Sequence, residues 1–202
     1  YLLICLMIVQ LVAYGQTKTL DFANLVSNSN GTQLGTTSFT QTTSAQESWT
    51  FTMLANSPAF FSYNDQTLWL QSGDPTATPI GNAKTSIKRA DGQNFNFNTI
   101  NFQTFSQDQY LTIEGKKAGA IKNTQNVYLA AANTSYPYSF TGWTDIDEVV
   151  LTITTNAQFP NNTSASDFYV GVTSFTYDPS PKIITNAPTP VGGTTATFNG
   201  NL

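Results

Sequence analysis

From Lys18 onward, the sequence consists of short runs in which apolar and polar residues alternate, separated by Gly, Asn, Asp and Pro. Alternation with a period of two is typical of half-buried β-strands, and the separating residues favour turns. No run shows the longer period of an amphipathic helix. The predicted strands are 18–22, 48–54, 59–63, 67–71, 85–89, 95–105, 110–114, 127–131, 149–155 and 168–177. This pattern predicts an all-β fold, a two-sheet antiparallel β-sandwich of the jelly-roll type.

Turn signals divide these strands. The Asp91-Gly92 pair predicts a tight turn, and the two prolines in 72–81 predict a loop because proline cannot donate to a strand ladder. The segment from Gly115 to Lys117 is expected to separate the strands on either side of it. Between Phe97 and Ile100 the two-residue apolar period breaks, which indicates a bulge or a corner.

The composition favours a globular protein without a nucleic-acid partner. Charged residues make up 10% of the chain and aromatic residues 13%, whereas a disordered chain is rich in charge and poor in aromatics. The net charge is -4, and the densest basic cluster is Lys116, Lys117 and Lys122. A nucleic-acid groove is more basic and more extended, so we interpret this cluster as the solvated face of a hairpin.

The N-terminal residues predict export. Tyr1 to Ala13 form an apolar run that ends at Ala13-Tyr14-Gly15, where small residues suit signal-peptidase cleavage. The run is shorter than the roughly 20 residues that cross a bilayer. We predict a signal peptide at 1–15 whose start is clipped, and a secreted or cell-surface protein with no membrane span in the mature chain. The alternative is a buried N-terminal strand or helix.

Two residue types that support much of enzyme chemistry are scarce. Cys5 is the only cysteine and lies in the predicted signal peptide, and the chain contains no histidine. Zinc sites built from Cys and His are therefore excluded, as are Ser-His-Asp and Cys-His catalysis. A glycosidase needs two carboxylates facing each other across a cleft, which no pattern in the sequence establishes. We expect no enzyme activity within this chain.

The composition changes at Asp178-Pro179-Ser180-Pro181. The prolines predict a rigid linker at 179–182, after a β-sandwich domain at 16–178. Alternation resumes at 183–202, which we interpret as the beginning of a second, truncated β domain.

Several segments resemble a jelly-roll family found in large secreted proteins of the Bacteroidetes. The segment Thr85–Gly92 (TSIKRADG), followed by Phe95 and Phe97, resembles the "R-x-D-G, x-F-x-F" hairpin of that family. Phe140–Val149 (FTGWTDIDEV) resembles its "G-F-x-x-V-D-E-V" segment, and Asp167–Val170 (DFYV) is similar to part of its closing strand.

The C-terminal segment Thr194–Asn201 (TTATFNGN) is similar to the opening of bacterial fibronectin type III-like or immunoglobulin-like repeats. These resemblances imply a carbohydrate-binding-like or adhesive module of a multidomain surface protein. The family often carries paired acids in its closing strand, where this chain has Gly171 to Ser174. A ligand or metal role for those acids is therefore not transferred to this chain.

Exposed aromatic rings are candidates for a glycan site, because sugar rings stack on flat aromatic faces beside amides and carboxylates. Trp49 and Trp69 stand in alternating strands, and we interpret both as core residues. Other aromatic residues lie near turn signals, where exposure is expected. The predicted ligand-binding residues are Trp143, Tyr136, Tyr138, Asn133 and Asp145.

The acids after the Gly-Trp-Thr segment have two interpretations. Asp145, Asp147 and Glu148 can form an Asx-type turn and the solvated start of a strand. They can also contribute oxygen ligands to a structural calcium ion. The predicted calcium ligands are Asp21, Asp145, Asp147 and Asp167. No other cofactor is expected.

Three functional hypotheses follow. The first is a non-catalytic binding module of an exported protein, with a polysaccharide or cell-surface glycan as partner. The second is a structural spacer or adhesin domain without a small ligand. The third is an accessory domain of a polysaccharide-degrading enzyme encoded beyond residue 202. An exposed aromatic platform near Trp143 favours the first, and burial of all three tryptophans with a smooth polar surface favours the second. Fold class alone does not choose among the three, because sandwiches host many functions.

Overall fold

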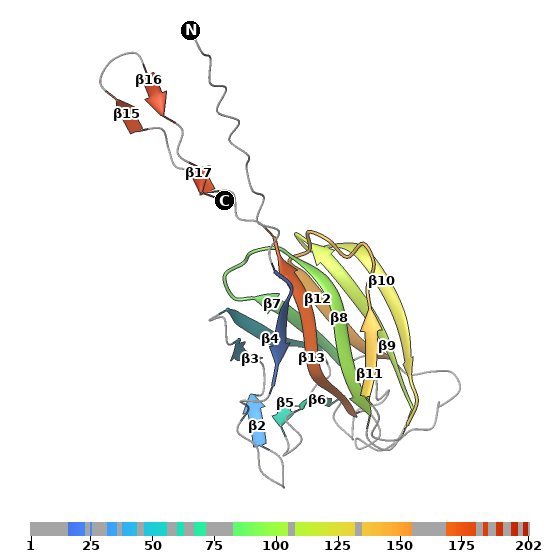
Figure 1. Ribbon diagram of the computed structural model, residues 1–202. Coiled ribbons are helices and arrows are strands. Elements are labelled where there is room, and N and C mark those ends of the chain that lie inside the picture. The colour runs from blue at the N-terminus through green and yellow to red at the C-terminus, as the bar shows by residue number, and fades with distance from the viewer. Residues whose placement is uncertain are drawn as a thin grey trace.

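The computed structural model describes most of the predicted sandwich (Figure 1). The described residues are 16–22, 25, 32–35, 38–43, 47–55, 60–62, 67–71, 83–104, 108–131, 135–154, 169–180, 184–185, 189–191, 195–197 and 200–201. The predicted signal peptide at 1–15 and the predicted loop at 72–81 lie outside them. Among the described residues, no helix is long and apolar enough to cross a membrane.

Two antiparallel sheets form the domain. The seven-stranded sheet has the order β11-β8-β13-β6-β5-β2, with β1 paired to β13. Its strands are β1 (Lys18–Asp21), β2 (Thr32–Gly35), β5 (Phe60–Ser62), β6 (Leu68–Gln71), β8 (Phe95–Thr104), β11 (Ser135–Ser139) and β13 (Tyr169–Pro179). The six-stranded sheet has the order β10-β9-β12-β7-β4-β3. Its strands are β3 (Ser38–Thr42), β4 (Ser48–Ala55), β7 (Ala83–Arg89), β9 (Gln109–Lys117), β10 (Ala120–Leu129) and β12 (Glu148–Thr154). The predicted all-β sandwich is confirmed.

The inner faces of the two sheets build one core. On β9, buried residues alternate with half-buried ones, as expected for a strand with one face inward. Trp49 of β4 is fully buried and meets three aromatic rings of the opposite sheet. Its ring centroid lies 4.8 Å from that of Phe95, 4.9 Å from that of Phe175 and 4.6 Å from that of Tyr177, all edge-on. Such edge-to-face pairs stabilise a core beyond the area they bury.

The break in the apolar period between Phe97 and Ile100 is a register shift. Thr99 pairs with Thr176 of β13 and Phe97 pairs with Tyr177, so Asn98 is the extra residue. The extra residue returns both Phe97 and Ile100 to the inner face, where both are buried. The predicted bulge is confirmed.

Three strands of the two large sheets match none of the predicted strands: β2, β3 and β11. The strand β3 (SFTQT) and the strand β11 (SYPYS) lie at sheet edges and carry few apolar residues. An edge strand needs only one paired side, which also explains why Pro137 is tolerated in β11. β3 has a single apolar residue, Phe39, and β11 contains a proline, which argues against a strand in the sequence.

The hairpin between β9 and β10 is longer than predicted. Its turn is not at Gly115 to Lys117 but at Ala118 and Gly119, which have φ values of 49° and 81°. Two consecutive residues with positive φ match the hairpin turn whose twist suits the flanking strands. The strands therefore run on through Lys117 and begin again at Ala120.

The closing strand β13 extends into the predicted linker. Pro179 still pairs with Phe95, and the backbone amide of Ser180 donates to the carbonyl of Asn94. Four short strands follow, β14 (Ile184–Thr185), β15 (Thr189–Val191), β16 (Thr195–Thr197) and β17 (Gly200–Asn201), paired as β14 with β17 and β15 with β16. The fibronectin-like second domain stays a prediction.

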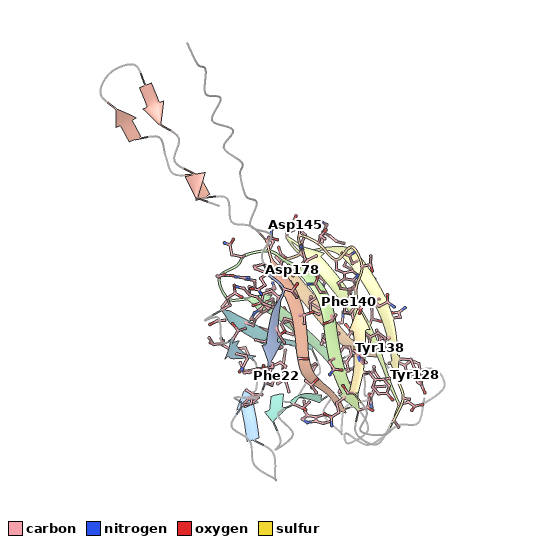
Figure 2. All side chains as sticks on the ribbon, in the orientation of Figure 1. Phe22, Tyr128, Tyr138, Phe140, Asp145 and Asp178 are labelled. Carbon is pink, nitrogen blue, oxygen red and sulfur yellow. The ribbon has the colours of Figure 1, made fainter. Side chains whose placement is uncertain are left out.

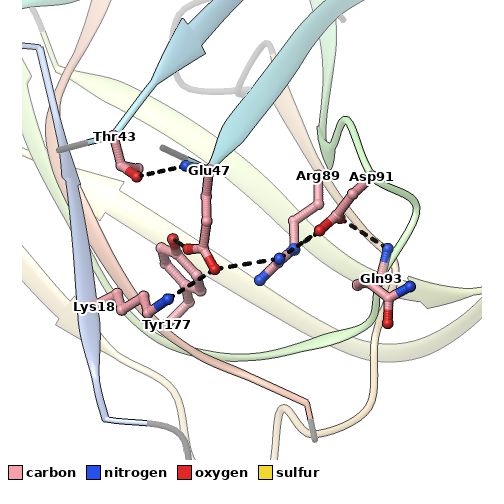
Figure 3. A network of polar contacts seen from close by, with 7 residues as sticks. All are labelled: Lys18, Thr43, Glu47, Arg89, Asp91, Gln93 and Tyr177. Carbon is pink, nitrogen blue, oxygen red and sulfur yellow. Dashed lines mark hydrogen bonds and ion pairs between the residues drawn. The ribbon is translucent and has the colours of Figure 1, made fainter. Parts of the chain in front are cut away.

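A polar network ties the two sheets together at one end of the sandwich (Figure 3). The carboxylate of Glu47, just before β4, accepts from Lys18 Nζ at 2.8 Å, from Arg89 Nη2 at 3.3 Å and from the hydroxyl of Tyr177. Lys18 and Tyr177 belong to the seven-stranded sheet and Arg89 to the six-stranded sheet. One carboxylate therefore joins both sheets.

The same network explains the R-x-D-G segment. Arg89 donates to both carboxylate oxygens of Asp91, at 3.0 and 2.6 Å, and Asp91 also accepts from the backbone amide of Gln93. Gly92 has a φ of +70°, a conformation that favours glycine. The motif therefore closes the turn between β7 and β8 and orients Arg89 toward Glu47.

The charges of this network affect the pKa of Glu47. Burial raises the pKa of the carboxyl group, but hydrogen bonds from Lys18 and Tyr177 and the charge of Arg89 outweigh burial. The net effect lowers the pKa of Glu47 below its ordinary value of 4.5. Because the folded state holds the ionised form more strongly, this stabilisation is present above the pKa of the unfolded chain and is lost as the pH falls through the folded pKa.

We predict that Glu47→Gln lowers the free energy of unfolding at pH 7 by about 1–3 kcal/mol, because charge-assisted hydrogen bonds become neutral ones. Urea unfolding followed by tryptophan fluorescence measures this difference. Between pH 7 and pH 3 the variant should lose less stability than the wild type. Parallel pH profiles for the two proteins would contradict the assigned role of Glu47.

Candidate functional site

Trp143 is buried, which corrects the expectation that its ring faces solvent. Only 6% of it is exposed, and its ring packs against Phe140 with centroids 4.5 Å apart and against Phe97 at 6.2 Å. The approach depends on Gly115 of β9, where an added Cβ would lie 2.9 Å from Trp143 Cε3. A turn in the sequence near Trp143 therefore does not imply an exposed ring.

Tyr136 and Tyr138 face inward from β11 and are half-buried against the core. The Tyr136 hydroxyl donates to the carbonyl of Ala130 at 2.9 Å, and the Tyr138 hydroxyl donates to the carbonyl of Tyr128 at 2.6 Å. Both bonds run from the edge of one sheet to the edge of the other. These two tyrosines therefore close the side of the sandwich and do not offer free ring faces.

The predicted ligand-binding residues are not brought together. Asp145 lies near the β9–β10 turn, where its carboxylate accepts from Asn94 Nδ2 at 2.7 Å and from Lys117 Nζ at 2.9 Å. Figure 2 shows Asp145 and Tyr138 well apart along the sandwich. The backbone amide of Asp145 donates to Asn96 of β8, whereas Tyr136 pairs with Phe102 of the same strand. These two positions on β8 are six residues apart, which corresponds to about 20 Å. Asn133 lies outside the described residues.

The predicted calcium ligands are also dispersed. Asp147 accepts from the backbone amide of Ala118 at 2.7 Å, which ties the segment to the hairpin turn. Asp21 pairs with Ser174 of β13, whereas Asn96, which contacts Asp145, pairs with Asp178 of the same strand. Four residues along a strand correspond to about 13 Å, so Asp21 lies about that far from Asp145. Within the described part of the chain, no three His, Cys, Asp or Glu residues cluster in a way that could hold a metal ion. Asp167 lies outside that part, so the calcium ion stays a prediction.

The outward face of the six-stranded sheet carries rows of polar side chains. The register aligns Lys84, Thr152, Thr112 and Asn126 in one row, and Thr52, Ser86, Val150, Glu114 and Thr124 in the next. The middle of this face is covered, because Val150 is 1% exposed and Ser86 is 2% exposed. The end of this face formed by β9 and β10 is open to solvent, because Thr124, Asn126 and Tyr128 are exposed. We call it the β9–β10 face, made of Tyr110, Thr112, Glu114, Lys116, Thr124, Asn126 and Tyr128.

A pair of tyrosines dominates this face. Tyr110 and Tyr128 are directly opposite each other on β9 and β10, with ring centroids 4.9 Å apart and planes inclined by 44°. Tyr128 is 47% exposed, whereas its neighbours Val127 and Leu129 point into the core. The pair therefore presents aromatic surface to solvent beside polar side chains.

Charged groups at the far end of the face are paired. Lys116 lies 3.4 Å from Glu114, and Lys88 of β7 lies 3.5 Å from Glu148 of β12. Glu148 also accepts from the hydroxyl of Ser86 at 2.5 Å. Glu148 and Ser86 are buried, whereas Lys116 and Glu114 each keep 20% of the side chain exposed and offer a donor and an acceptor on the β9–β10 face.

The alternation of residues in the sequence already indicates that both tyrosines of this pair face outward. In the predicted strands at 110–114 and 127–131, Leu111, Ile113, Val127 and Leu129 alternate with Tyr110 and Tyr128. A tyrosine at the polar positions of an alternating strand faces away from the core. What the sequence did not reveal was the register that places the two rings opposite each other.

Comparisons with known proteins give a fold likeness only. No family model matches the sequence, and no curated protein matches it. Among solved structures, the family 29 carbohydrate binding module CBM29_1 from Piromyces equi is 11% identical, with a TM-score of 0.45 over 81% of this chain and 91% of that chain. The low affinity xylan binding module CBM86 from Roseburia intestinalis is 16% identical, with a TM-score of 0.39 over 71% and 94%. A CBM29-2 mutant complexed with cellulohexaose is 8% identical, with a TM-score of 0.43 over 80% and 91%.

We predict that Trp143→Ala lowers the free energy of unfolding by about 3–5 kcal/mol, as expected for truncation of a buried aromatic ring. Trp49→Ala, at a fully buried position, should cost a similar amount. Gly115→Ala should also destabilise the protein, and by less when Trp143 is already alanine, because the clash with its ring is then absent. Urea titrations of the single and double variants measure both effects. A nearly unchanged stability for Trp143→Ala would place its ring outside the core.

Proposed function

We propose that this chain is a non-catalytic carbohydrate-binding module and that the β9–β10 face holds the glycan. The observation that carries the proposal is the stacked Tyr110–Tyr128 pair, in which Tyr128 is exposed and Tyr110 half-buried, beside a row of hydroxyl, amide and paired charged side chains. Aliphatic ring faces of sugars pack on aromatic rings, and sugar hydroxyls accept from amide and hydroxyl donors and donate to carboxylates.

The polar side chains lie within reach of a sugar held on the tyrosine rings. Thr112 and Asn126 form the next row along the face, and the Thr112 hydroxyl donates to Asn126 Oδ1 at 3.0 Å. Glu114 and Lys116 follow on β9. A chain of sugars lying along β9 and β10 would therefore meet the rings first, then an amide and a hydroxyl, and then a paired carboxylate and amine.

The wider setting is also part of the proposal. The predicted signal peptide at 1–15 supports an exported protein at the cell surface or secreted, and the tail at 183–202 supports a multidomain chain with a fibronectin type III-like or immunoglobulin-like repeat. A binding module in such a chain holds the whole protein at a polysaccharide or at a cell-surface glycan. The third hypothesis, an accessory domain of a polysaccharide-degrading enzyme, fits the same site.

A spacer or adhesin domain is the second candidate function. Trp49, Trp69 and Trp143 are all buried, at 0%, 4% and 6% exposure, which is the observation that favours it. Under this alternative the tyrosine pair is surface packing between adjacent strands, and the sandwich serves to separate or display neighbouring domains.

Binding to soluble glucan, mannan, xylan and polyuronate tests the proposal, measured by affinity electrophoresis and calorimetry. We expect one glycan class to bind, and Tyr128→Ala and Tyr110→Ala each to raise Kd about three- to tenfold, because a stacking surface is lost. The control is Leu54→Ala, which truncates a side chain that is 50% exposed on β4 of the same sheet. It should leave Kd within twofold.

Two further outcomes separate the alternatives. If the wild-type protein binds none of the polysaccharides, the spacer or adhesin function is favoured. If binding requires calcium and is lost with a chelator, a metal ion takes part, and Asp167 is the predicted ligand to substitute next.

A further inference from the structure

Two residues outside the β9–β10 face hold Tyr128 from different sides. The Tyr128 hydroxyl donates to Asp108 Oδ2 at 2.6 Å, and the backbone amide of Ala131 donates to Asp108 Oδ1 at 2.7 Å. Asp108 immediately precedes β9, so its carboxylate joins the open end of the hairpin to the ring. The hydrogen bond from Tyr128 and that from Ala131 lower the pKa of Asp108, which keeps the carboxylate ionised near neutral pH.

The other contact acts on the backbone. The Tyr138 hydroxyl reaches from β11 and donates to the carbonyl oxygen of Tyr128 at 2.6 Å. Figure 2 shows Tyr138 and Tyr128 on neighbouring edges of the sandwich. Tyr138 is half-buried against the core, and its ring lies 6.1 Å from that of Phe102, so its hydroxyl is held in place. The main chain that carries Tyr128 is therefore anchored to the opposite sheet.

We infer that Asp108 and Tyr138 are positioning residues, which fix the side chain and the backbone of Tyr128 so that its ring is pre-organised beside Tyr110 for a sugar. This inference rests on the proposed function of the β9–β10 face. A tyrosine on an edge strand has free rotation about its side-chain bonds, and ordering such a side chain on binding costs affinity. A ring that is already ordered avoids this cost.

In this arrangement the hydroxyl group of Tyr128 is bonded to Asp108 and is not directed at the ligand. The carboxylate of Asp108 raises the pKa of Tyr128 to about 12, chiefly through their hydrogen bond. The phenol therefore stays protonated and donates to Asp108 over the whole physiological pH range. The face of the ring, and not its hydroxyl, is left for the ligand.

A double-mutant cycle tests the inference on the side chain. With the glycan class that the wild type binds, Asp108→Ala should raise Kd on the order of fivefold, the effect of losing one hydrogen bond. In a Tyr128→Phe background, the same substitution should change Kd by less than twofold, because the bond to the hydroxyl is already absent. Asp108→Asn, which keeps an acceptor oxygen, should restore part of the loss. Equal losses in both backgrounds would overturn the role of Asp108.

A matched pair tests the inference on the backbone. Tyr138→Phe and Tyr136→Phe each remove one hydroxyl from β11, but only Tyr138 bonds to the carbonyl of Tyr128. Tyr138→Phe should raise Kd two- to fivefold and Tyr136→Phe should leave it unchanged, with thermal unfolding measured for both variants. Equal effects on Kd would overturn the role of Tyr138. Absence of glycan binding by the wild type would instead reject the proposed function, and this inference with it.

Discussion

Burial of the Trp49 ring between the two sheets is the contact on which the rest of the sandwich depends. Its three edge-on partners come from β8 and β13, so one side chain of the six-stranded sheet packs against both central strands of the other. Glu47, two residues earlier in the chain, joins the same two sheets through polar contacts. Apolar packing and a shared carboxylate therefore act on one end of β4. These inward-facing rings are buried in the core, so they offer no surface to a ligand.

The edge between β10 and β11 shows how the fold supports the proposed site. Tyrosines on β11 donate to backbone carbonyls at the end of β10, where an unpaired edge would otherwise be exposed. The hydroxyl of Tyr138 donates to the backbone carbonyl of Tyr128, and the ring of Tyr128 faces solvent. Closure of the sandwich and presentation of an aromatic ring are thus achieved by the same pair of strands.

Sequence reasoning succeeded for strands with long alternating apolar runs and failed for short strands at the sheet edges. The bulge between Phe97 and Ile100 was predictable because each neighbouring apolar residue must return to the core. The edge strands β3 and β11 were not, since their residues are mostly polar and pair on one side only. The expected exposure of Trp143 was wrong for a related reason. Whether Trp143 is exposed depends on the space above Gly115, which belongs to a strand far away in the sequence.

The sequence by itself determined that this chain forms antiparallel strands around an aromatic core, because the alternation of apolar and polar residues is a local property that each strand carries alone. The chain also contains no histidine, and its one cysteine is Cys5. Only the tertiary structure decided which aromatic rings face solvent. That outcome depends on register and on contacts between distant strands, which place Tyr110 opposite Tyr128 and bury Trp143 against Gly115.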